Sequence, residues 1–172
     1  MPISETFKAD IEEGQRLRGW ITNAYAQIEY LLGDLILRCR EFPQYAEATC
    51  VFSHSAKKRA HSVKLMLDMP GPLSHFSVEL TSVIKRFEEG HNTRNLLAHG
   101  FCEYIHTQSG DAGLKFQKFH RDKGQDNAHL IRIFQLVDLK VERDRFVELS
   151  DEALRLFMRV HKYFGWTARP GS

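Results

Sequence analysis

Apolar residues recur every three or four positions in four separate stretches of the chain. These stretches span about residues 5–41, 55–68, 74–98 and 138–164. Steps of three and four are typical of amphipathic helices that bury one face. Ser4 is a suitable cap for the first helix and Pro43 a suitable stop, while Met69-Pro70-Gly71-Pro72 ends the second. The pattern therefore predicts four helices.

A different pattern occupies residues 101–137, between the third and fourth helices. The side chains of a strand point alternately to its two faces, and this spacing places Cys102, Tyr104 and His106 on one face. The same alternation returns at Leu114 and Phe116. Two polar segments, 109–113 and 122–127, have the composition of turns, and the segment 130–137 is rich in β-branched residues. We expect a small antiparallel β insertion here. The predicted fold is mainly α, a four-helix bundle with this insertion between helices 3 and 4.

Length and composition fit one globular domain. The chain has 172 residues, 42% of them hydrophobic, so we expect a single domain over residues 1–172 with a loose tail at 166–172. The net charge is only +2, so an RNA-binding surface would have to be a local patch. Three cysteines without a CxxC spacing favour a reducing compartment over a disulfide framework.

The sequence does not predict a signal peptide or a membrane helix. The first residues, Met1-Pro2-Ile3-Ser4, lack the basic and apolar segments of a signal peptide. Apolar runs are far shorter than the roughly 20 residues that a membrane helix needs. We therefore expect a cytoplasmic protein without a membrane partner.

The segment Arg94-Asn95-Leu96-Leu97-Ala98-His99-Gly100 carries the candidate chemistry. On a continuous helix, His91, Asn95 and His99 share one face with Glu88. Arg94 would continue the apolar face of Phe87, about 20° away from it.

A core-facing arginine is costly unless it is paired. Glu29, an isolated acid in an apolar part of the first helix, is the expected partner of Arg94. In a purely structural interpretation, Arg94 pairs with Glu29 and His99 interacts with the negative end of the helix dipole.

A catalytic interpretation is also open. RNA cleavage without a metal needs a base for the ribose 2′-hydroxyl, a cation beside the phosphate and an acid for the leaving oxygen. His99 suits the base or acid, Arg94 suits the phosphate, and Asn95 suits the orientation of either group. Glu88 and His91 would support this set. A two-fold dimer would bring two copies of the motif into one cleft.

The Arg94–Gly100 motif resembles the R-N-x-x-x-H signature of the HEPN superfamily. The long first helix, the β insertion after the histidine and the final helix are similar as well, over roughly residues 5–165. The resemblance implies a helical bundle, a homodimeric composite site and, in many members, metal-independent endoribonuclease activity. It also implies roles in toxin–antitoxin, phage-defence or RNA-processing systems, with a possible antitoxin or defence partner. Other members bind RNA or nucleotides without catalysis, or act only as scaffolds.

Further candidates are less specific. Lys57, Lys58, Arg59 and Lys64 form a basic run on the second helix that could follow a phosphate backbone or simply be a solvated face. Pairs of histidines occur at 54/61 and 91/99, but without an HExxH motif or a Cys/His cluster. The chain also lacks a glycine-rich phosphate loop. We expect neither a metal nor a cofactor.

Overall fold

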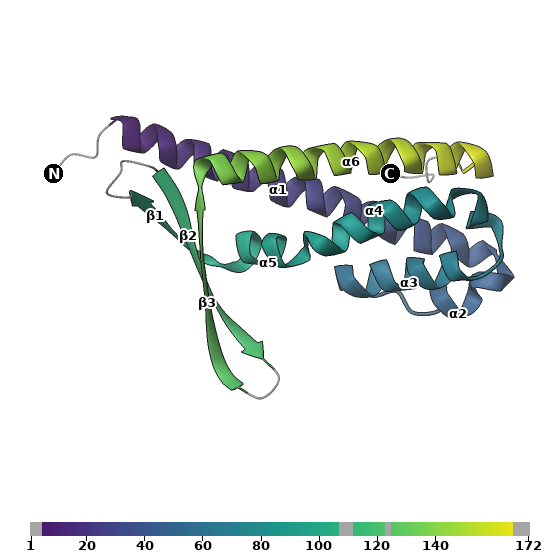
Figure 1. Cartoon of the computed structure of the whole chain (residues 1–172). Coiled ribbons are helices and arrows are strands. Elements are labelled where there is room, and N and C mark those ends of the chain that lie inside the picture. The colour runs from purple at the N-terminus through teal and green to yellow at the C-terminus, as the bar shows by residue number, and fades with distance from the viewer. Residues whose placement is uncertain (1–4, 107–111, 123–124, 167–172) are drawn as a thin grey trace, which may run out of the picture. The chain divides into compact units, whose positions relative to one another are not determined.

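The computed structural model describes residues 5–106, 112–122 and 125–166 (Figure 1). The described chain is mainly helical, with one three-stranded antiparallel sheet between its fifth and sixth helices. The helices are α1 (Glu5–Arg38), α2 (Ala46–Thr49), α3 (Ala56–Asp68), α4 (Ser77–Glu89), α5 (His91–His99) and α6 (Leu136–Phe164). The strands are β1 (Phe101–His106), β2 (Ala112–Asp122) and β3 (Gln125–Gln135). Short 3-10 segments occupy Cys39–Glu41, Pro43–Tyr45 and Pro72–Phe76.

These elements confirm the predicted helical character and the antiparallel insertion. α1 ends at Arg38 and continues as a 3-10 turn up to Phe42, just before Pro43. α6 begins two residues earlier than expected, at Leu136, and the Asp138 carboxylate accepts a hydrogen bond from the Gln135 N–H at 3.1 Å. The assembly of the helices into a four-helix bundle of the HEPN type remains a prediction.

The expected helix 74–98 is not continuous. Residues 72–76 form a 3-10 segment, α4 ends at Glu89, and α5 begins at His91 after Gly90. Gly90 has φ −79° and ψ −10°, and its N–H bonds to the Arg86 carbonyl at 3.3 Å. A glycine inside a helix favours such an interruption because it lacks a Cβ and loses more backbone entropy. The extrapolation that placed Glu88 and Phe87 on the faces of the motif helix assumed an unbroken helix and therefore does not hold.

The sheet has the order β1-β2-β3, and its register determines which residues share a face. Phe116 pairs with Cys102 on one side and Arg132 on the other, while Leu114 pairs with Phe134. Leu114, Phe116 and Phe134 are buried, which makes this the inner face. The turn expected at 122–127 is shorter than predicted because β2 reaches Asp122 and β3 begins at Gln125. The turn expected at 109–113 lies mostly outside the described residues, as does most of the tail.

The chain divides into two compact units. We call residues 1–24 and 91–147 the sheet unit, and residues 25–90 and 148–172 the helical unit. In the sheet unit, α1 and β2 approach closely, because a Cβ added at Gly14 would lie 3.2 Å from Leu114. In the helical unit, the Tyr25 and Phe87 rings stack at 4.1 Å. The prediction of one domain is not tested by this division.

None of the described helices, in residues 5–106 and 125–166, is both long and apolar enough to cross a membrane.

Candidate functional site

The motif forms α5 and the residue that follows it. Thr93, Leu96 and Leu97 are buried and hold the helix against its unit. Arg94 and Asn95 are half-buried, and His99 is exposed at the last position of the helix. The burial pattern thus exposes the imidazole that the sequence proposed as acid or base.

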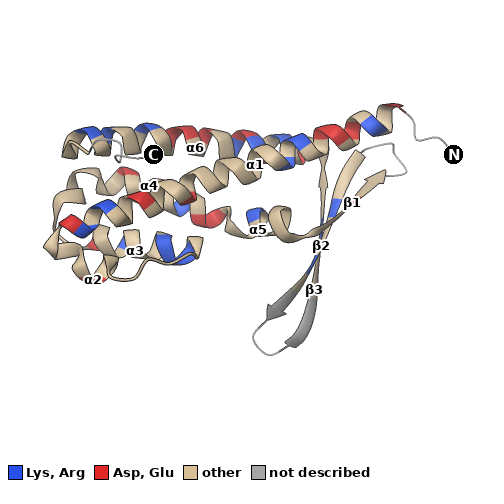
Figure 2. Cartoon of the chain, turned by 180° about the vertical axis from the view of Figure 1, so that it is seen from behind, with Lys and Arg blue, Asp and Glu red and all other residues tan. Residues whose placement is uncertain are grey.

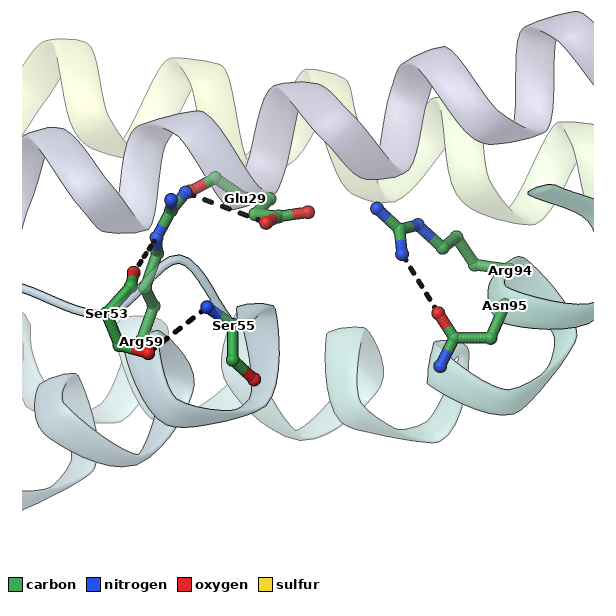
Figure 3. Close-up of polar contacts among 6 residues, drawn as sticks. All are labelled: Glu29, Ser53, Ser55, Arg59, Arg94 and Asn95. Atoms are coloured by element: carbon green, nitrogen blue, oxygen red, sulfur yellow. Dashed lines mark hydrogen bonds and ion pairs between the residues drawn. The ribbon is translucent and has the colours of Figure 1, made fainter. Parts of the chain in front are cut away.

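Asn95 connects two other side chains of α5. The Arg94 Nη1 donates to Asn95 Oδ1 at 2.9 Å (Figure 3). Asn95 Nδ2 lies 2.9 Å from His91 Nε2. A guanidinium can only donate, so Asn95 Oδ1 must accept and its amide nitrogen must donate to His91. This network requires an unprotonated Nε2 on His91. It fixes the Asn95 amide between the Arg94 guanidinium and the His91 imidazole.

The end of α5 is anchored by α1 and by the sheet. The Arg18 Nε donates to the Leu97 carbonyl at 2.6 Å, and the same guanidinium lies 5.5 Å from the centre of the Phe116 ring. The Gly100 N–H donates to the Leu96 carbonyl at 2.8 Å. Carbonyls of the last helical turn otherwise lack partners, so these bonds stabilise the end that presents His99.

A glycine is needed at position 100 because neighbouring atoms leave no room for a side chain. An added Cβ would lie 2.5 Å from the Leu96 carbonyl oxygen and 3.3 Å from the Phe116 ring. The close approach of backbone and sheet explains the glycine at the end of the motif.

Two neighbouring hollows lie beside α5 in the sheet unit. The first, of about 470 Å³, is lined by His99, Phe101, Gln117, Lys118, Phe119 and His129. The second, of about 350 Å³, is lined by Asn92, Asn95, Leu96, Lys118, Leu130 and Arg132. Lys118 lines both hollows, so one cation lies between the His99 side and the Asn95 side.

Arg132 is held in place at the second hollow. Its Nη1 donates to the Thr93 hydroxyl at 3.4 Å, and its guanidinium lies 4.5 Å from the centre of the Phe134 ring. Lys118 and Arg132 thus bring to the hollows the positive charge that a phosphate backbone requires. The expected Arg94 lines neither hollow and contacts Asn95 instead.

The expected supporting acids have partners in the helical unit. A carboxylate oxygen of Glu29 lies 3.6 Å from Arg59 Nη1 (Figure 3). Glu88 pairs with Lys64 at 3.1 Å. The expected pairing of Glu29 with Arg94 joins residues of the two units and remains a prediction.

The basic run on α3 separates into two kinds of residue. Lys57 and Lys58 are exposed near the start of α3, where Figure 2 shows basic positions. Arg59 instead donates to the Ser53 carbonyl at 2.7 Å and lies over the Phe52 ring at 4.9 Å. Contact of this run with RNA remains a prediction, and the two exposed lysines are its most accessible members.

No cluster of three or more His, Cys, Asp or Glu suited to a metal ion occurs among the described side chains. The three cysteines, Cys39, Cys50 and Cys102, are free thiols, and burial raises the pKa of Cys39 to about 12.

The sequence missed Phe101, Lys118, Phe119, His129 and Arg132. Their signal is the period-two pattern of the strands, which places Phe101, Phe119 and His129 on one face of the sheet and Lys118 and Arg132 on the other. That pattern does not give the pairing of β2 with β3, so the joining of these residues into hollows beside α5 could not be derived.

Comparison with known proteins gives no relative: neither a protein-family model, a curated protein nor a solved structure matches the chain. The resemblance to HEPN proteins therefore rests on the motif and the order of elements in this sequence, and not on a matched relative.

Proposed function

We propose that this protein is a metal-independent endoribonuclease of the HEPN type that acts as a homodimer. The observation that carries the proposal is the exposed His99 at the end of α5, beside a hollow that also contains Lys118 and an aromatic surface. Asn95, held by hydrogen bonds from the same helix, lines the neighbouring hollow.

In the proposed reaction, His99 takes the proton of a ribose 2′-hydroxyl. The 2′-oxygen attacks the adjacent phosphorus, and the bond from phosphorus to the 5′-oxygen breaks. A second acid protonates that leaving oxygen, and the product ends in a 2′,3′-cyclic phosphate. Arg94 stabilises the charge that develops on the phosphate oxygens, since its planar fork matches two of them.

The proposed homodimer supplies the second acid. One chain contributes one His99, whereas the reaction needs a base and an acid at the same phosphate. A two-fold axis beside α5 would bring the partner's His99 and Arg94 to the same cleft.

A nucleotide-binding module without catalysis is the second candidate. It is favoured by the size and lining of the second hollow, because about 350 Å³ beside Asn95, Lys118 and Arg132 suits a small anionic ligand. A bound nucleotide recovered from the purified protein, together with an absence of cleavage, would support this candidate instead.

The test is cleavage of single-stranded RNA in excess EDTA by the wild type and by variants of α5. We expect His99→Ala and Arg94→Ala each to lower the rate by about two to four decades, with helicity and dimerisation retained. Asn95→Ala should lower it less, because an orienting amide neither moves a proton nor carries charge. His61→Ala, at an exposed histidine of α3, is the matched control and should retain full activity. EDTA-sensitive cleavage, or full activity of His99→Ala, would contradict the proposal.

A further inference from the structure

The outer face of the sheet is unusually apolar for a surface exposed to water. Phe101, Phe119, Ile131 and Ile133 lie on this face and are 66%, 76%, 49% and 53% exposed. An antiparallel sheet with one buried face normally presents polar residues on the other. Contiguous exposed apolar side chains of this kind mark a binding surface.

The aromatic residues on this face form a platform. Phe119 pairs in register with His129, and their rings stack with centroids 5.2 Å apart and planes 24° apart. Phe101 pairs with Gln117, two positions from Phe119, so the two phenylalanines are diagonal neighbours. Diagonal side chains in a sheet lie about 7–8 Å apart, close enough to bracket one planar ring. The hollow of about 470 Å³ lies among these residues.

The charge at this hollow favours an anionic chain. Lys118 and two imidazoles, His99 and His129, are among its six described lining residues, and none of the six is acidic. Glu103, on the same face, is neutralised by Lys115 at 3.0 Å. Lys118 lines this hollow although its strand position belongs to the opposite face of the sheet, together with Arg132 of the second hollow. At the aromatic hollow itself, a phosphate would therefore lie beside Lys118 while the base contacts the rings.

We propose that the hollow between Phe101 and Phe119 is a stacking subsite for one unpaired base of single-stranded RNA. The base would lie next to the phosphate that His99 reaches. Aromatic platforms bind bases through their π-faces, and this requires bases that are not already stacked in a duplex. A protein partner fits less well, because the cores of protein interfaces are depleted in lysine, and Lys118 lies between the two hollows. The identity of the RNA rests on the proposed function, whereas the subsite itself is tested by binding alone.

The experiment measures, by fluorescence anisotropy, the affinity for a labelled single-stranded RNA with 2′-O-methyl groups. The methyl groups block the 2′-oxygen nucleophile, so this probe resists the proposed reaction. Phe119→Ala should weaken binding by about 5- to 150-fold, the usual loss for one stacked base. Phe119→Leu keeps apolar area but removes the ring and should be weakened similarly, whereas Phe119→Trp should bind like the wild type. Because Phe119 is 76% exposed, these variants should fold, and circular dichroism verifies this. The affinity for the corresponding duplex RNA should be the same in all three variants as in the wild type.

Several outcomes would overturn the subsite. These are wild-type affinity in Phe119→Leu, no binding of the probe by the wild type, or a change of oligomeric state in Phe119→Ala without a change in affinity. The last would make this face an interface between copies of the chain. Binding that depends on Phe119, without cleavage of unmodified RNA, would support the subsite while the nuclease proposal fails. Cleavage of unmodified RNA, together with binding that does not depend on Phe119, would support the nuclease proposal while the subsite fails.

Discussion

Gly100 illustrates how a single residue constrains the end of the motif helix. A Cβ at this position would lie 2.5 Å from the Leu96 carbonyl oxygen, a backbone atom that cannot move without disturbing α5. We expect Gly100→Ala to lower the free energy of unfolding by about 1–3 kcal/mol, the usual cost of overpacking. Urea denaturation gives this value.

Gly19 provides the matched control for that substitution. It lies exposed inside α1, with nothing within 4 Å of an added Cβ. Gly19→Ala should therefore stabilise the protein by about 0.5–1 kcal/mol through helix propensity. If both substitutions changed the free energy of unfolding equally, the close contact with the Leu96 carbonyl would not be the reason for a glycine at position 100.

His161 predicts a pH dependence of stability. Burial and then the nearby Arg38 lower the pKa of His161, while Asp34, 3.0 Å away, opposes the shift. Arg38 already binds the Asp34 carboxylate at 2.8 Å, so a second cation there gains little. The folded state holds this proton less tightly than the unfolded chain does, so stability falls as the pH drops below about 6.5.

The measurement compares thermal unfolding at about pH 7.5 and about pH 5.5. His161→Gln should lose less Tm on acidification than the wild type, because the group that binds the extra proton on unfolding is gone. His61→Gln, at an exposed position, should behave like the wild type. An unchanged loss in His161→Gln would contradict the assignment.

At the scale of elements, Arg59 connects α3 with the segment before it and with α1. Its side chain is 14% exposed, and it donates to the carbonyls of Ser53 at 2.7 Å and Glu29 at 3.3 Å (Figure 3). Arg59→Ala should lower the free energy of unfolding by about 2–3 kcal/mol, because charged hydrogen bonds to half-buried carbonyls are lost. Arg59→Lys should recover only part of this, since an ammonium cannot span both carbonyls.

The neighbouring Lys57 and Lys58 serve as controls for Arg59. Both are exposed, so replacement of either by Ala should change stability by no more than about 0.5 kcal/mol. If Arg59→Ala were equally mild, the guanidinium contacts would contribute nothing to holding these elements together.

The elements were predicted well where local periodicity determines them. The long helices and the three strands follow from spacing, and Pro43 and Pro70 follow the ends of α1 and α3 within a few residues. The interruption at Gly90 was missed, because apolar residues keep their helical spacing on both sides of the glycine. A single glycine is also tolerated in many helices, so it does not predict a break by itself.

At the scale of the whole molecule, only part of the candidate site could be predicted. Arg94, Asn95 and His99 lie within six consecutive residues, so the sequence alone places them on one helix. Phe119 and His129 meet only through the register of β2 with β3, and hydrophobic alternation alone does not determine which residues pair. The motif residues could therefore be proposed from the sequence, whereas the surface beside them could not.

The central claim is that His99 and Arg94 cleave RNA through its own 2′-hydroxyl. The most direct measurement compares an RNA cut at a mapped position with the same RNA carrying one 2′-deoxy nucleotide on the 5′ side of that position, both in excess EDTA. The account predicts a 2′,3′-cyclic phosphate on the first product and no cleavage of the second at that position. Equal cleavage of both RNAs would contradict it, because the nucleophile would then be something other than the neighbouring hydroxyl.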